Sequence, residues 1–220
     1  KIQVQSDGGL IVAIISNATT ILDAGAFSAS LGSMVHIKTL TASSSGTLSF
    51  VNGASSVVLD DTYPIYKFLL FNIHPGGSSE LTFNASDDGS SHAYDITKTT
   101  THHYTVHGES GGSGNQYYVQ AEDLAQSTAF QHLMGGTQIG TANSDSHSGE
   151  LTIFNPSSTT FMKHFTSRTQ YISSSAQKYQ YDAYQAGYFN TTAALTAFQF
   201  KMNSGNMDTG KIKLYGIKDS

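Results

Sequence analysis

The sequence predicts an all-β protein, an antiparallel β-sandwich that is jelly-roll-like and carries a short N-terminal arm. Short apolar or alternating runs recur at a spacing of roughly 8–12 residues, which is typical of sandwich and barrel folds. Turns rich in Gly and Ser separate these runs, and the 220 residues include 21 glycines. Helical periodicity is weak throughout the chain, so the strand interpretation dominates.

The expected organisation is one domain with an appendage. Residues 1–31 are predicted to be an arm or a linker to an upstream module, with a strand at Leu10–Ile15, and residues 32–220 are predicted to form the sandwich domain. The expected strands of that domain lie at Met34–Leu40, Thr47–Val51, Ser56–Leu59, Pro64–His74, Glu80–Ala85, Thr101–His107, Gln116–Ala121, Glu150–Phe154 and Thr160–Tyr171, with one or two more marked by Tyr179, Tyr181 and Tyr188.

Two hairpins are expected. Asn52-Gly53 lies between Thr47–Val51 and Ser56–Leu59, and both residues of this pair tolerate positive φ in a tight turn. Near the C-terminus, the turn Ser204–Gly210 is expected to pair two strands. The apolar residues of that hairpin are Phe198, Phe200 and Met202 before the turn, and Ile212 and Leu214 after it.

The sequence does not decide the secondary structure of one segment. In Asp123–Met134, the residues Leu124, Ala125, Phe130 and Leu133 lie at roughly helical spacing. The segment is therefore either a short crossover helix or a strand with flanking loops.

Composition excludes several classes of protein. The formal net charge is −5, only 12% of residues are charged, and Arg168 is the only arginine, so no basic patch for nucleic acid is expected. No apolar run approaches the roughly 18–20 residues of a membrane span, so membrane insertion is not expected. The chain has no cysteine. It begins at Lys1 without a leader, which favours a processed chain or a piece of a longer one.

No metal, cofactor or catalytic residue is predicted. His102, His103 and His107 are the densest histidine cluster. On a strand, His103 and His107 share a face but lie about 13 Å apart, too far for one ion, while His102 points the other way. No serine lies in a G-x-S-x-G pattern that has a strand before it and a helix after it. The only glutamates are Glu80, Glu109, Glu122 and Glu150, and nothing singles out a pair for glycoside hydrolysis.

Tyrosines are the candidate ligand-binding residues. Tyr rings stack on the faces of sugar rings, and their hydroxyl groups form hydrogen bonds. Tyr117, Tyr118, Tyr181 and Tyr184 are the candidates for this role. The alternative is that about half of the tyrosines fill the core or a subunit interface, where Tyr is also enriched.

Five segments in order along the chain resemble a C-terminal domain found in virion structural proteins of marine tailed bacteriophages, including tail-fibre and other particle-surface proteins. They are Ser55–Pro75, Ser86–Thr101, Asp123–Leu133, Ser148–Phe165 and the ending FQFKMNSGNMDTGKIKLYGIK (Phe198–Lys218), which is the most specific. The resemblance runs from about residue 32 to residue 218, and residues 1–31 fit it less well.

The resemblance implies a non-enzymatic virion protein at the particle surface, on a tail fibre or on the capsid, with a role in host adhesion or particle decoration. It implies a homo-oligomer, with a trimer expected, that contacts other virion proteins and binds a host surface glycan. It brings no catalytic residues. Two alternative functions stay open. The second hypothesis is a lectin-like carbohydrate-binding module, and the third is a polysaccharide depolymerase.

Overall fold

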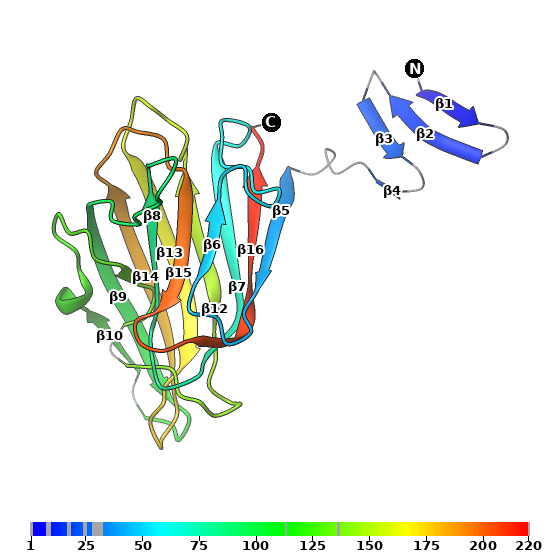
Figure 1. Ribbon diagram of the computed structural model, residues 1–220. Coiled ribbons are helices and arrows are strands. Elements are labelled where there is room, and N and C mark those ends of the chain that lie inside the picture. Colours follow the sequence, from blue (N-terminus) through cyan, green and yellow to red (C-terminus); the bar gives the residue numbers. More distant parts are fainter. Residues whose placement is uncertain are drawn as a thin grey trace.

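The computed structural model describes residues 2–7, 10–16, 19–23, 26–27, 33–112, 114–135 and 137–219 (Figure 1). Apart from one short 3₁₀ helix, the regular structure in these ranges consists of strands. In chain order the elements are β1 (Ile2–Asp7), β2 (Leu10–Ser16), β3 (Thr19–Asp23), β4 (Ala26–Phe27), β5 (Met34–Thr41), β6 (Leu48–Val51), β7 (Ile65–Pro75), β8 (Leu81–Ser86), β9 (Lys98–Gly108), β10 (Asn115–Tyr118), η2 (Gln120–Glu122), β11 (Gln131–His132), β12 (His147–Phe154), β13 (Lys163–Ile172), β14 (Tyr179–Phe189), β15 (Ala197–Met202) and β16 (Met207–Ile217).

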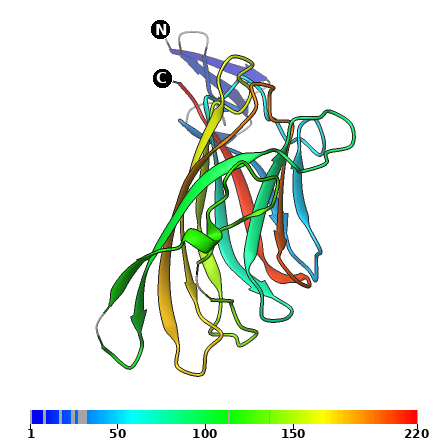
Figure 2. The ribbon, with the colours of Figure 1, turned by 90° about the vertical axis from the view of Figure 1, so that its left-hand side faces the viewer.

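Two antiparallel sheets pack against each other as a sandwich (Figure 1 and Figure 2). The larger sheet has eight strands in the order β10-β9-β14-β13-β12-β7-β16-β5, and the smaller has four in the order β11-β8-β15-β6. The predicted all-β antiparallel sandwich is therefore confirmed. The jelly-roll arrangement is not confirmed, because the sheets hold eight and four strands rather than two equal sets.

The N-terminal strands form a sheet of their own. β1 to β4 pair in chain order as a four-stranded antiparallel sheet. β2 confirms the strand predicted at Leu10–Ile15. All strands of the sandwich lie between Met34 and Ile217. The role of residues 1–31 as an arm or linker stays a prediction.

Alternation along the strands builds the sandwich. In β13, buried and exposed residues alternate from Lys163 to Gln170, so that Phe165 points into the core while Arg168 points to the outside. A strand with one apolar face gains by burying that face against a second sheet. The other face of β13 remains on the surface and is available for recognition.

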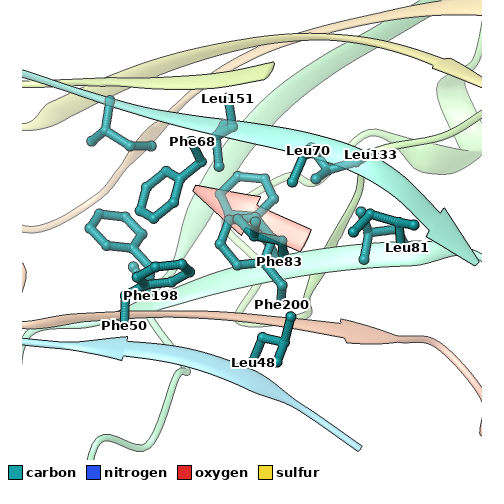
Figure 3. Packing of buried hydrophobic residues seen from close by; sticks show 14 of the residues in the cluster. Leu48, Phe50, Phe68, Leu70, Leu81, Phe83, Leu133, Leu151, Phe198 and Phe200 are labelled. Carbon is teal, nitrogen blue, oxygen red and sulfur yellow. The ribbon is translucent and has the colours of Figure 1, made fainter. Parts of the chain in front are cut away.

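Phenylalanine rings join the two sheets at the centre of the core (Figure 3). Phe68 comes from β7 in the large sheet, and its ring centroid lies 5.2 Å from Phe198 and 5.1 Å from Phe200 of β15 in the small sheet. Phe50 of β6 meets Phe68 edge-to-face at 5.2 Å. These residues are fully buried. Such tilted and edge-to-face pairs contribute about 0.5–1.5 kcal/mol each beyond the burial of apolar area.

The prediction that the two C-terminal strands pair as a hairpin is wrong. β15 pairs with β8 and β6, whereas β16 pairs with β7 and β5 in the other sheet. The turn between them crosses from one sheet to the other. Phe200 of β15 and Leu214 of β16 are both buried, on strands of opposite sheets. Alternation alone predicts the same apolar positions for a hairpin and for two strands that face each other across a core.

The predicted hairpin around Asn52-Gly53 is also wrong, although the turn exists. Gly53 has a φ of +78°, and its N–H donates to the carbonyl of Val57 at 2.9 Å. Residues 56–59 are nevertheless not a strand. Ser55 and Ser56 both take positive φ values, which end the extended conformation. β6 pairs with β15 instead.

The segment Asp123–Met134 is not a helix. It contains only the two-residue strand β11, and the one short helix of this region, η2, ends just before it. The alternative of a strand with flanking loops is therefore the correct one. β11 pairs with β8 at the edge of the small sheet, with His132 opposite Thr82.

Lys98 is a lysine buried in the sandwich. Its side chain is fully buried, and Nζ donates to Asn84 Oδ1 at 2.7 Å and to the carbonyl of Ile96 at 2.9 Å. Burial lowers the pKa of Lys98 from 10.5 to about 7, and the nearby Asp95 opposes part of this effect. Between these two values, the unfolded chain binds a proton that the folded chain does not.

We therefore expect stability to rise with pH between about 7 and 10.5, by up to about 1.4 kcal/mol per pH unit from this group. Lys98→Met should remove that slope. Urea unfolding at several pH values measures it. Lys211→Met is the control, because the Lys211 side chain is exposed and its loss should keep the wild-type slope. Parallel slopes for wild type and Lys98→Met would contradict the assignment.

Candidate functional site

The outer face of the eight-stranded sheet carries a row of polar and aromatic residues. The strand registers place Tyr118, His103, Tyr184, Arg168 and Glu150 directly opposite one another, one on each of β10, β9, β14, β13 and β12. We call this set the outer row. Directly opposed residues have Cβ atoms about 4.5–5.5 Å apart, so neighbours in the row can interact.

Contacts within the outer row order its centre. The His103 and Tyr184 rings stack with centroids 5.0 Å apart and an interplanar angle of 4°. The Arg168 guanidinium lies 5.1 Å from the centre of the Tyr184 ring. It also donates two hydrogen bonds to Asp182, from Nε at 3.1 Å and from Nη2 at 2.8 Å. Tyr184 is therefore held between a histidine and the only arginine of the chain.

Asp182 anchors this group electrostatically. Partial burial raises its pKa, but the hydrogen bonds from Arg168 and from the Tyr184 hydroxyl outweigh burial and lower it below the ordinary value. The Tyr184 hydroxyl donates to Asp182 Oδ2 at 2.8 Å, and this bond raises the pKa of Tyr184. Asp182 is therefore ionised at neutral pH and orients both neighbours.

A shallow depression of about 520 Å³ lies beside the outer row, over Gly149. Its walls include Phe71, Glu150, Arg168 and Gln170. The register between β12 and β7 shifts at Gly149, and a Cβ there would lie 2.5 Å from the Arg168 carbonyl oxygen. Only glycine fits this close approach, and its lack of a side chain leaves the hollow open.

A second depression, of about 570 Å³, lies on the other side of Phe71. It is lined by Gly210 and Lys213 of β16, among others, and Gly210 also lies where the register shifts, with a φ of +124°. The Lys213 ammonium is 5.2 Å from the centre of the Phe71 ring. Phe71 is 41% exposed and stands between the two hollows. The face thus offers an aromatic ring flanked by cations, a carboxylate and amides.

The four tyrosines predicted from the sequence divide between the two faces of the large sheet. Tyr118 and Tyr184 belong to the outer row. Tyr117 and Tyr181 lie on the inner face, where each contacts Tyr104, with centroids 5.3 Å and 5.2 Å away. Tyr181 also stacks on Tyr171 at 4.8 Å. We call Tyr117, Tyr104, Tyr181 and Tyr171 the inner row.

Burial increases steadily along the inner row. Tyr117 is 45% exposed, Tyr181 is 8% exposed, and Tyr171 is 2% exposed. The Tyr171 hydroxyl donates to the carbonyl of Gly135. Tyr181 is therefore a core residue, whereas Tyr117 and Tyr118 remain accessible. The prediction that these four residues bind a ligand stays a prediction.

Sequence analysis did not single out Phe71. The run Pro64–His74 is one of the expected strands, and the observed β7 lies between β12 and β16. Asn72 has a φ of +47°, and it and Phe71 are exposed side by side, which interrupts the alternation. The signal in the sequence was the polar Asn72 inside an apolar run.

Histidines are distributed as the strand pattern predicts. His102 is fully buried, whereas His103 and His107 face outward from β9. Burial lowers the pKa of His102 to about 4, so it is neutral, and its Nε2 lies 3.0 Å from the Gln185 amide nitrogen. A neutral imidazole accepts a hydrogen bond from that amide.

Among the described residues, one group has the composition and spacing of metal ligands: Glu80, Glu122 and His132. Both carboxylates converge on His132 Nδ1 rather than facing each other across an open cleft, as a glycosidase pair does. Their separation in sequence leaves no local motif, so sequence analysis missed them.

Comparisons with known proteins give no relative for this chain: no family model, no curated protein and no solved structure matches it. In the part of the chain that the structure describes, no helix has the length and apolar character needed to span a membrane.

Gly149 provides a test of how the first depression is built. Gly149→Ala should destabilise the protein by roughly 1–3 kcal/mol, because its Cβ would collide with the backbone of β13. Gly77→Ala is the matched control, since a Cβ there meets nothing within 4 Å. Urea unfolding of both variants measures the difference. Equal stabilities would show that the sheet accommodates a side chain at residue 149.

Proposed function

We propose that the chain is a non-enzymatic structural domain of a bacteriophage virion, displayed at the particle surface on a tail fibre or on the capsid, for host adhesion or particle decoration. It associates with copies of itself, as a trimer, and with other virion proteins. The resemblance of five segments to virion surface domains supports this, as do the sandwich fold and the low charge content of 12%.

The observation that carries the proposal is a group of exposed apolar side chains at the two ends of the uncharged loop between β12 and β13. Phe161 is 69% exposed, and Phe154 and Met162 are exposed as well. No charged residue occurs from Phe154 to Met162. The next residue, Lys163, is buried, with Nζ donating to the carbonyl of Thr191 at 3.2 Å. Exposed apolar groups of this kind mark contact surfaces, and an uncharged loop packs on its own copy without a charge left unpaired.

We expect the full chain to run as a trimer in size-exclusion chromatography with light scattering. The double variant Phe161→Ser, Met162→Ser should lower the mass toward that of the 23.5 kDa monomer, because it removes the apolar contact. Tyr118→Ser, which changes another highly exposed aromatic residue, is the control and should keep the trimer mass. A wild-type protein that stays monomeric at all concentrations would contradict the proposal.

The second candidate function is carbohydrate binding on the outer face of the large sheet. The specific observation is Phe71, an exposed ring between two hollows that Arg168, Glu150 and Lys213 border. Sugar rings stack on aromatic faces, while their hydroxyl groups bind charged and amide side chains. The hollows are open, as is suitable for a residue within a longer polysaccharide chain.

A glycan array tests this candidate with the full chain. Phe71→Ala should weaken binding of a recognised surface polysaccharide at least about tenfold, equivalent to about 1.4 kcal/mol. If Phe71 rather than the tyrosines of β10 carries recognition, Tyr118→Ala should keep binding. The reverse result would place recognition at the exposed tyrosines of β10. Absence of binding to every surface polysaccharide tried would reject the carbohydrate candidate but not the structural one.

A further inference from the structure

Three side chains meet where the small sheet ends. Glu80 immediately precedes β8, Glu122 is the last residue of η2, and His132 is the last residue of β11. β11 pairs with β8 with His132 opposite Thr82, which brings His132 next to Glu80. We call Glu80, Glu122 and His132 the carboxylate–histidine cluster. None of these residues belongs to the outer row or to the two hollows.

The distances within the cluster fit a bound ion. The Glu122 carboxylate oxygen lies 3.2 Å from His132 Nδ1, and the Glu80 carboxylate contacts the same nitrogen. One ligand atom from each residue lies within 4.8 Å of the others. Ligands held at about 2.1 Å in tetrahedral geometry are about 3.4 Å apart. A small ion placed between the three ligand atoms would therefore require only minor adjustment of the three side chains.

A buried amide holds two of the three backbone segments together. Gln131 is fully buried, and its Nε2 donates to the carbonyl of Glu122 at 3.1 Å and to that of His132 at 3.0 Å. Its Oε1 accepts a hydrogen bond from Thr100 Oγ1 at 2.6 Å. Nε2 thus links the backbone of Glu122 to that of His132, while Oε1 ties the amide to β9. Such outer partners are what metal sites use to orient their ligands.

A second amide orients Glu80. Asn203 Nδ2 donates to the Glu80 carboxylate at 3.3 Å, and Asn203 Oδ1 accepts from the Glu80 backbone N–H at 3.1 Å. Asn203 therefore forms hydrogen bonds with both the backbone and the side chain of Glu80. All three members of the cluster are thus positioned by residues outside it, independently of their contacts with one another.

Charge in the cluster also favours a cation. Two carboxylates face a single imidazole, and the side chains of Glu80, His132 and Glu122 are only 14%, 27% and 21% exposed. Next to them, His102 is fully buried, interacts electrostatically with Glu80 and His132, and has an Nδ1 with no hydrogen-bond partner among the described residues. Half-buried like charges without full compensation are costly, and a divalent ion supplies the missing positive charge.

We propose that Glu80, Glu122 and His132 form a binding site for one divalent transition-metal ion, with Zn²⁺ as the representative. The donor set of one imidazole nitrogen and two carboxylate oxygens is one that Zn²⁺ accepts, whereas Ca²⁺ and Mg²⁺ prefer oxygen ligands alone. Three protein ligands leave a fourth position for water or for an oxygen of an outside ligand. The competing interpretation is a hydrogen-bonded triad that binds no ion.

Calorimetric titration of ZnCl₂ into the untagged full chain, stripped of metal by a chelator, tests the proposal. We expect one strong site per chain. Glu122→Gln keeps the shape of the side chain but removes its charge, and it should weaken this site at least about tenfold, as should His132→Ala. His107→Ala, which removes an exposed histidine outside the cluster, is the control and should bind Zn²⁺ as wild type does.

Two further measurements address variants that are less stable. Co²⁺ bound to wild type should give visible absorption bands of a four-coordinate site, and Glu122→Gln should lose them. Zn²⁺ should also raise the melting temperature of wild type but not of Glu122→Gln, since an ion stabilises only a fold that binds it. No strong site in wild type, or equal Zn²⁺ binding by wild type and both cluster variants, would overturn the proposal and leave the hydrogen-bonded triad.

Discussion

The packing of Phe68 against Phe198 and Phe200 is the contact on which the rest of the structure depends. It joins the eight-stranded sheet to the four-stranded sheet and so decides which face of every strand is inside. Because side chains alternate along a strand, fixing the inner face also fixes the outer one. Arg168 and Tyr184 are paired on the surface for the same reason that Phe165 and Ala183 of these two strands are buried in the core.

Irregularities in the strand register of the large sheet form the hollows on that surface. The hollows next to Phe71 arise where glycines replace side chains at register shifts, at Gly149 and Gly210. The outer row is polar and ordered, whereas the loop that carries Phe161 is uncharged and exposes two apolar side chains, Phe161 and Met162. The domain thus separates a face rich in hydrogen-bonding groups from a loop that exposes apolar groups.

Sequence analysis could predict the features that depend on local pattern. Alternation located most strands and the inward and outward orientation of His102 and His103, because each depends only on neighbouring residues. It could not assign β15 and β16 to opposite sheets, since either pairing buries the same residues. It could not find the cluster of Glu80, Glu122 and His132 either, because long-range pairing of β8 with β11 creates it.

The inequality of the two sheets has a consequence for how the domain comes apart. The four-stranded sheet cannot cover the whole inner face of the eight-stranded sheet. The inner row shows where the covered part ends, because the exposed fraction of the side chain rises from 2% at Tyr171 to 45% at Tyr117. Strands that bury little apolar surface open with a small free energy, while those at the centre of the core open only on global unfolding. The edge strand β10, whose four residues are all exposed, therefore opens at a lower free energy than the strands that carry the phenylalanine core.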